Sequence, residues 1–150
     1  MPLNIVLINP EIPTNTGNIG RLCLATGSHL HLIKPLGFEI TDKQLKRAGL
    51  DYWQHLEVIT YHDFDDFLNK NTNARLVLFT AHAKQNIWKI VFQENDFLLF
   101  GKESVGLPKS ITEKYPDNCY KVPMYSKNIR SLNLANAAAI VIYEGLRQLQ

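Results

Sequence analysis

Short apolar runs alternate along this chain with segments of helical pattern, and this alternation constrains the fold most. The apolar runs cover residues 4–8, 30–33, 76–79 and 97–100. The helical patterns cover residues 16–25, 43–48, 64–68, 108–114 and 134–149. Runs that are apolar throughout are typical of strands buried on both faces. The alternation therefore predicts an α/β fold, a mostly parallel sheet with helices on both faces.

Length and composition fit one folded domain, which we expect to span residues 1–150. Hydrophobic residues make up 45% of the chain and charged residues 20%. A chain of this length buries roughly 70% of its unfolded surface, enough for a sizeable core. The beginning of the chain lacks a basic leader, and no stretch reaches the roughly 18 apolar residues of a membrane span. We expect a cytoplasmic protein without a membrane partner.

The formal net charge of +2 is too small to indicate nucleic-acid binding by itself. Basic residues do gather in two places: Lys43, Lys46 and Arg47, and Lys121, Lys127 and Arg130. Each group could contact phosphates or could be a solvated surface. Neither the two cysteines nor the five histidines have metal-ligand spacing, so no metal site is expected.

The first candidate site is Asn15-Thr-Gly-Asn18, which follows a turn rich in proline after the first apolar run. Ligands of open parallel sheets bind beyond the carboxyl ends of the strands, where this stretch should lie. Asn15 or Thr16 could cap a helix that carries Arg21 about one turn further on. Taken alone, the pattern favours a capped helix with a surface arginine.

The second candidate site follows the apolar run 97–100. Gly101 and Gly106 allow a sharp turn or a close approach of the backbone to a ligand. Glu103 lies between them and could bind a ligand or anchor the loop, and the residues alone favour the anchor. The spacing of Gly101 and Ser104 does not match a serine nucleophile elbow, and Leu107 after Gly106 does not match a phosphate-binding P-loop.

The third candidate site opens the last helix. Ser131 is a suitable N-cap, and Asn133 and Asn136 lie on one helix face, where buried amides would need hydrogen-bond partners from the protein or from a ligand. The apolar stretch 137–143 predicts burial on most sides of this helix. It could be a central core helix or could be covered in part by a second subunit, and we favour the second subunit.

Considered together, three motifs resemble those of the SPOUT ribose 2′-O-methyltransferases. They are Asn15-x-Gly-Asn-x-x-Arg21, Gly101-x-Glu-x-x-Gly-Leu-Pro108, and Val122-Pro-Met124 followed by Ser131-Leu-Asn-Leu-Ala-Asn136. Their order and spacing match as well. The segments 10–18 and 46–52 and the length of the chain resemble one branch, the minimal wobble-position tRNA methyltransferases.

The resemblance implies an α/β fold whose C-terminal third forms a trefoil knot around an S-adenosylmethionine pocket, with S-adenosylhomocysteine as product and no metal. It also implies a homodimer through the first and last helices, in which Arg21 of one subunit faces the cofactor pocket of the other. The implied partner is tRNA, modified at the ribose 2′-hydroxyl of nucleotide 34, a cytidine or modified uridine.

The resemblance also assigns roles to residues. It implies a catalytic set of Arg21, Asn15, Ser131 and Asn133 and a cofactor site of Phe79, Gly101, Glu103, Val122, Ser131 and Leu132. Expected RNA contacts are Lys43, Lys46, Arg47, Arg130 and Tyr143, although Tyr143 could simply be an interface aromatic. The chain departs from the branch at Phe79, usually leucine, and at Lys102 and Val105, where proline and arginine are common; the loss of arginine at Val105 could alter specificity.

The family's proposed base is Arg21, but a guanidinium stays charged in proteins. We expect Arg21 instead to stabilise the developing charge on the ribose oxygen and to fix the neighbouring phosphate. Two alternatives stay open at this point: 2′-O-methylation of another RNA such as ribosomal RNA, and a catalytically silent RNA-binding dimer.

Overall fold

The computed structural model describes residues 2–41 and 43–150, and the side chains of residues 46 and 48–51 lie outside that description. Its strands are β1 (Asn4–Ile8), β2 (His29–Ile33), β3 (Val58–Tyr61), β4 (Leu76–Phe79), β5 (Gln85–Asn86), β6 (Phe97–Phe100) and β7 (Cys119–Lys121). They form one seven-stranded sheet in the order β3-β2-β1-β6-β4-β7-β5, and each pair of named strands runs parallel. The predicted parallel sheet is confirmed.

The helices are α1 (Pro13–Thr26), α2 (Lys43–Gly49), α3 (Phe64–Lys70), α4 (Lys109–Thr112) and α5 (Leu134–Leu149). Short 3-10 turns are η1 (Leu50–His55), η2 (Ile87–Lys89) and η3 (Pro116–Asn118). The sequence pattern missed β3, an edge strand in which only Tyr61 is buried. Val58, Ile59 and Tyr61 are good strand formers, but the polar Thr60 interrupts the apolar run, so this segment lacks the continuous apolar run from which strands were predicted.

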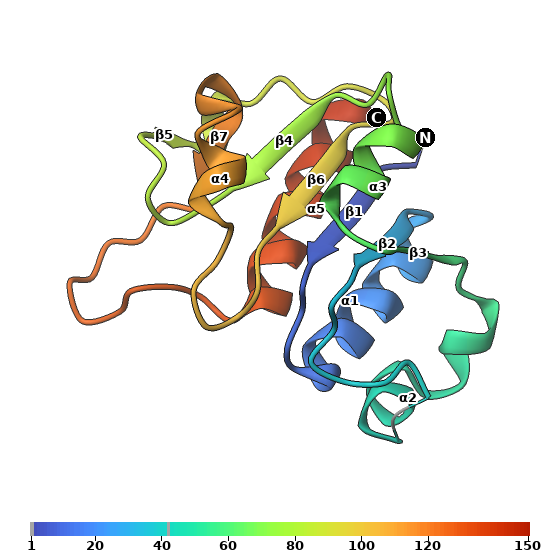
Figure 1. Cartoon of the computed structure of the whole chain (residues 1–150). Coiled ribbons are helices and arrows are strands. Elements are labelled where there is room, and N and C mark those ends of the chain that lie inside the picture. Colours follow the sequence, from blue (N-terminus) through green and yellow to red (C-terminus); the bar gives the residue numbers. More distant parts are fainter. Residues whose placement is uncertain (1, 42) are drawn as a thin grey trace.

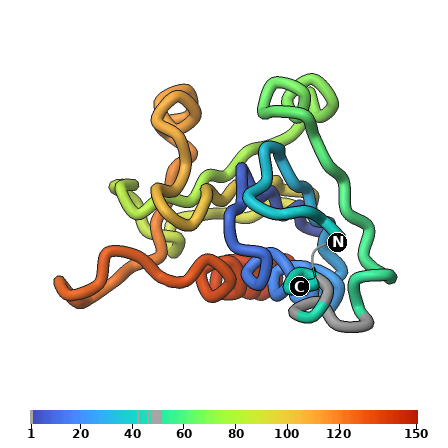
Figure 2. Tube along the Cα trace, turned by 60° about the horizontal axis from the view of Figure 1, so that its bottom comes forward, coloured from blue at the N-terminus to red at the C-terminus, as the bar shows by residue number. Residues whose placement is uncertain are grey.

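Helices cover both faces of the sheet, as predicted (Figures 1 and 2). Alternate residues of β1 point to opposite faces. Ile5 and Leu7 join the core under α1 and α5, whereas Val6 and Ile8 join the core under α3 and α4. Figure 2 shows α1 and α5, blue and red, on one side of the sheet. The two helices also contact each other.

Helix α1 begins earlier than predicted. Pro13 occupies its first turn, and Ile12 is the N-cap residue without a side-chain cap. Proline suits this position because its missing N–H would have no helical partner there. Asn15 and Thr16 are therefore buried inside the first turn and do not cap the helix. The prediction of a local cap was wrong because, as shown below, a carboxylate from a distant loop satisfies the helix start.

Helix α5 is capped by Asn133 and not by Ser131, which corrects the predicted N-cap. The Asn133 side chain accepts hydrogen bonds from the backbone N–H groups of Ala135 (2.9 Å) and Asn136 (3.2 Å). Asn136 itself is exposed, so the two asparagines are not a buried amide pair. The outer face of α5 also exposes Ile140 and Tyr143, with 40% and 53% of their surface accessible.

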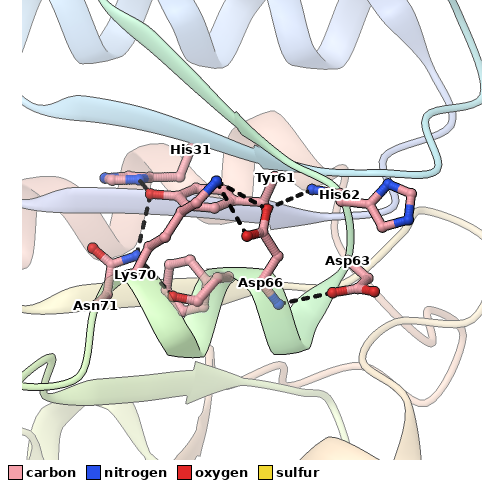
Figure 3. A network of polar contacts seen from close by, with 8 residues as sticks. His31, Tyr61, His62, Asp63, Asp66, Lys70 and Asn71 are labelled. Atoms are coloured by element: carbon pink, nitrogen blue, oxygen red, sulfur yellow. Dashed lines mark hydrogen bonds and ion pairs between the residues drawn. The ribbon is translucent and has the colours of Figure 1, made fainter.

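A buried polar chain centred on His31 crosses the sheet face under α3 (Figure 3). His31 Nδ1 lies 2.8 Å from the Tyr61 hydroxyl, which also accepts a hydrogen bond from Asn71 (3.2 Å). On its other side, His31 Nε2 lies 3.0 Å from Asn4 Oδ1. Burial lowers the pKa of His31 from 6.5 to about 4, with a smaller contribution from His29. His31 is therefore neutral at physiological pH.

Candidate active site

A cavity of about 690 Å³ opens beyond the carboxyl ends of β4, β6 and β7. All three sequence motifs contribute to its lining. Phe79 and Val122 supply apolar wall, and the Phe79 ring stacks on Phe100 with centroids 5.0 Å apart. Arg130, Ser131 and Leu132 line its exposed rim. Cavities of this size with apolar walls and a few polar groups are typical small-molecule sites.

The loop after β6 needs glycine at both predicted positions. A Cβ atom on Gly101 would lie 2.0 Å from the Gly106 carbonyl carbon and 2.1 Å from the Leu107 nitrogen. Gly106 donates a backbone hydrogen bond to the Lys102 oxygen (2.8 Å) and has φ 75°, a conformation that favours glycine. The loop therefore folds back on itself and presents its backbone along the cavity.

Glu103 links the loop after β6 to the start of α1. Its two carboxylate oxygens accept hydrogen bonds from the backbone N–H groups of Glu11 (2.8 Å) and Ile12 (2.9 Å). Asn15 Nδ2 also donates to Glu103 (3.2 Å). A carboxylate at a helix N-terminus both satisfies free N–H groups and complements the helix dipole. This contact replaces the local cap that the sequence pattern predicted.

The same chain of polar contacts continues into the third motif. Asn133 Nδ2 donates to Asn15 Oδ1 at 3.1 Å, so Glu103, Asn15 and Asn133 form one hydrogen-bonded series along the cavity. These residues come from three segments that are far apart in the sequence. The structure thus brings together three of the predicted site residues.

Glu11 is a residue of this region that had no predicted role. Its Oε1 atom accepts hydrogen bonds from the Ser104 hydroxyl (2.7 Å) and from the Ser104 backbone N–H (2.9 Å). The hydrogen bond from the Ser104 hydroxyl is the main cause that lowers the pKa of Glu11. Two carboxylates therefore link the same two loops: Glu103 binds the segment before α1, and Glu11 of that segment binds Ser104 in the loop after β6. Glu11 lies in the segment 10–18 that resembles the branch, but only the loop geometry reveals its contact with Ser104.

Arg21 is exposed and, of the described residues, is not among those that line the cavity. It lies about 12 Å along α1 from Pro13, two turns in and not one. Its guanidinium carbon lies 4.9 Å from the centroid of the Tyr52 ring, which belongs to η1. A single chain thus does not bring Arg21 together with the Glu103 series.

The predicted RNA-contacting residues lie on separate elements. Lys43 and Arg47 are exposed on α2, which packs against α1. The side chain of Lys46 is outside the described residues. Arg130 lies at the cavity rim, and Tyr143 lies on the exposed face of α5.

Within residues 2–41 and 43–150, no group of three or more His, Cys, Asp or Glu side chains is placed to hold a metal ion. In the same residues, no helix is long and apolar enough to cross a membrane.

The chain is similar over nearly its whole length to known methyltransferases. It is 47% identical to a tRNA (cytidine(34)-2′-O)-methyltransferase of Saccharophagus degradans, covering 97% of this chain and 95% of that protein. It is 46% identical to the enzyme of the same name from Escherichia coli K12, covering 98% of this chain and 94% of that protein.

Solved structures show the same relationship. One that is described as giving insights into the 2-OH methylation of C/U34 on tRNA superposes with a TM-score of 0.94 at 44% identity, covering 98% of this chain and 95% of that one. The methyltransferase AviRb from Streptomyces viridochromogenes, in complex with the cofactor AdoMet, gives 0.86 at 24% identity over 99% of this chain and 58% of its own. The latter supports the fold alone. The sequence profile of the SpoU rRNA Methylase family matches residues 2–143, and the chain belongs to this SpoU methylase family.

Proposed function

We propose that this protein is an S-adenosylmethionine-dependent methyltransferase that modifies the ribose 2′-hydroxyl of the wobble nucleotide, position 34, of tRNA. Its close relatives of nearly equal length carry that activity in their names. The observation that carries the proposal is the hydrogen-bonded series Glu103–Asn15–Asn133 along the cavity. We further propose that one SPOUT domain spans residues 1–150 and acts in the cytoplasm, where tRNA is modified.

The cavity fits the proposed cofactor. At Gly101 the loop's own backbone occupies the place of a Cβ atom, so this glycine sets the shape of the cavity wall that a cofactor would contact. The apolar surfaces of Phe79 and Val122 suit an adenine ring, while the exposed rim at Ser131 and Leu132 suits the polar end of the molecule. S-adenosylmethionine would supply an electrophilic methyl group bound to a sulfonium. Phenylalanine in place of the branch's leucine at 79 is compatible with contacts made by the main chain.

We propose that the C-terminal third forms the trefoil knot of SPOUT proteins. Support comes from strand order: β7 lies between β4 and β5, and β6 lies between β1 and β4, although β5 precedes both in sequence. The chain then returns from β7 through the cavity-lining segment 122–134 to α5, on the face that α1 also covers. This strand order and return path support a knot in which the closing segment would pass through the loop formed by earlier parts of the chain.

The proposed homodimer would complete the site. Arg21 is outside the cavity of its own chain, so a second subunit would be needed to bring Arg21, in addition to the Arg130 already at the rim, to a cavity. Helices α1 and α5 contact each other, and α5 exposes Ile140 and Tyr143. An exposed isoleucine and tyrosine on one helix are suited to burial between subunits. This arrangement would place Arg21 of one protomer at the cavity of its partner.

In the proposed reaction, the ribose 2′-oxygen forms a bond to the methyl carbon as the bond between carbon and sulfur breaks. The hydroxyl proton leaves to solvent, and the electron pair of the broken bond stays on sulfur. Asn15 and Asn133 hold the α1 and α5 starts in place, and Ser131 lies at the rim. Arg21 of the partner would donate N–H groups to the developing oxyanion and to the adjacent phosphate.

RNA would approach across both subunits. Arg130 at the cavity rim and the exposed Lys43 and Arg47 on α2 are available to phosphates, and Tyr143 would lie near the subunit boundary. Val105 is 71% exposed at the cavity and leaves that point without a cation. The net charge of only +2 means that such local groups, and not an overall field, must attract the RNA.

The proposal is tested with total tRNA from a strain that lacks this protein and labelled S-adenosylmethionine. We expect label at the ribose of nucleotide 34, located by nuclease digestion and mass spectrometry. Label elsewhere in tRNA, or in ribosomal RNA only, would favour the alternative of a different RNA site. Calorimetry that detects no cofactor binding, with or without tRNA, would favour the silent RNA-binding dimer instead.

A further inference from the structure

We infer that Tyr52 is a positioning residue for Arg21, which it holds through the face of its aromatic ring. The inference rests on the proposed function, since it concerns the arginine proposed to act in methyl transfer. The Arg21 guanidinium carbon lies 4.9 Å from the centre of the Tyr52 ring, within the range of an attractive cation–π contact. Both side chains are exposed, with 40% of Tyr52 accessible, so the contact forms at a surface that another molecule can reach.

The backbone of α1 explains why Tyr52 is found at this place. A Cβ atom on Gly20 would lie 2.7 Å from Trp53 Cζ3 and 2.9 Å from Leu56 Cδ2. Gly20 therefore lets Trp53 pack directly against the α1 backbone. Because Arg21 follows Gly20 and Tyr52 precedes Trp53, this contact sets the ring and the guanidinium beside each other.

The turn that carries Tyr52 is anchored by the residues that follow the ring. Trp53 and Leu56 pack against the core cluster that contains Ile19 of α1. The backbone N–H of Leu56 donates to the Trp53 carbonyl at 3.1 Å, which closes the turn. Tyr52 is thus held by its neighbours, while its own ring remains at the surface. An aromatic side chain on such an anchored turn can restrain a long and flexible arginine.

A ring face restrains arginine without occupying its donors. Stacking uses the plane of the guanidinium, so its N–H groups at the edge stay free for a phosphate and an oxyanion. A carboxylate partner would use those donors and neutralise the charge. Among the residues that the structure describes, the recorded ion pairs do not include Arg21.

Three substitutions of Tyr52 distinguish the effect of the aromatic ring face from the effects of the hydroxyl group and of side-chain volume. Tyr52→Phe and Tyr52→Trp keep an aromatic face, whereas Tyr52→Leu keeps apolar bulk without one. We expect kcat of the Phe and Trp variants within about twofold of wild type and kcat of the Leu variant lower by roughly fivefold or more. The Kd for S-adenosylmethionine should not change in any variant, because Tyr52 does not line the cavity.

A matched control removes an exposed aromatic elsewhere. Trp88 on η2 is 56% exposed, and Trp88→Leu should leave kcat unchanged. A double-mutant cycle isolates the pair: Tyr52→Leu should have no further effect on kcat once Arg21 is alanine. Circular dichroism and gel filtration check that fold and subunit state are preserved.

Each outcome decides for or against the inference. If the Phe and Leu variants have the same kcat, whether both are normal or both are impaired, the inference is overturned. Loss of cofactor binding or of the native subunit state in the Leu variant would also count against it, because Tyr52 would then be purely structural. Failure of the wild-type protein to methylate tRNA would instead refute the proposed function, so the two failures are distinguishable.

Discussion

Acidification should destabilise this protein through protonation of His31. Asn4 Nδ2 donates to the Asn95 carbonyl (3.1 Å), so Asn4 Oδ1 is left to accept from His31 Nε2–H. His31 Nδ1 then accepts from the Tyr61 hydroxyl, which in turn accepts from Asn71. A proton on Nδ1 would place two donors against each other in a buried site. The neutral ring satisfies the chain of contacts, and the charged ring does not.

The magnitude follows from the two pKa values. Burial lowers the pKa of His31 from 6.5 to about 4, so the unfolded chain binds the proton more tightly than the folded one. The stabilisation is complete above pH 6.5 and is lost as the pH falls from about 6.5 towards about 4. From pH 7.5 to pH 5 the loss is about 2 kcal/mol, out of about 3 kcal/mol for the whole transition.

Urea unfolding at fixed protein concentration, at several pH values between 7.5 and 5, measures this loss. The window avoids carboxylates such as Glu144, whose pKa is lowered to about 2 by hydrogen bonds from Arg147 and Gln148. His31→Gln should remove most of the pH dependence, whatever its effect on absolute stability. His62→Gln is the matched control, because its ring points away from His31 (Figure 3). A free energy of unfolding that is flat in wild type, or a slope that survives in His31→Gln, would refute the reasoning.

Three further substitutions test the site and its support. Glu103→Ala removes the acceptor for two backbone N–H groups and for the Asn15 side chain. The kcat for methyl transfer should fall by about tenfold or more while the protein stays folded. A normal rate would contradict the role of this carboxylate. Gly101→Ala should abolish cofactor binding in calorimetry, since its Cβ would clash with backbone 2.0 Å away; normal binding would show that the loop can move. Arg75→Ala removes the 2.8 Å ion pair of Asp96, which is only 1% exposed. The free energy of urea unfolding should fall by about 2 kcal/mol, less than for a fully buried pair because Arg75 is 39% exposed. No change would mean that other contacts satisfy Asp96.

The sheet was predictable because its central strands are buried on both sides. Residues 4–8 form an apolar run of the kind expected for a strand buried on both faces, and the structure places this strand in the interior of the sheet, between β2 and β6. The edge strand β3 gave no such signal, since Thr60 is exposed there. The apolar pattern thus reports burial and not the presence of a strand as such.

Helix starts were less predictable than helix existence. Local cap rules favoured Asn15 or Thr16 for α1, but Glu103 satisfies that helix start from 88 or more positions away in sequence. For α5, Ser131 and Asn133 are both good caps, and only the geometry selects Asn133. A cap supplied from another segment cannot be read from local sequence.

Sequence motifs predicted which residues belong to the site, but they did not predict the contacts that depend on tertiary packing. Glu103, Asn15 and Asn133 belong to motifs, and the structure joins them. Glu11 and Tyr52 lie in the branch-like segments 10–18 and 46–52, but their contacts with Ser104 and Arg21 depend on the fold and were not predicted. The apolar stretch 137–143 indicated a second subunit, but the position of Arg21 relative to the cavities could be anticipated only from the family resemblance, because no local pattern relates the two.

Purified mixed dimers test the central claim most directly: that Arg21 of one protomer completes the cavity of its partner. Arg21→Ala and Gly101→Ala chains, co-expressed with different affinity tags, give a heterodimer in which one site has both an intact cavity and an intact arginine. We predict that this heterodimer methylates the wobble ribose at about half the wild-type rate per dimer, while the Gly101→Ala homodimer is inactive and the Arg21→Ala homodimer retains only a small residual rate. An inactive heterodimer would contradict the account, because it would place the cavity and its arginine in the same chain.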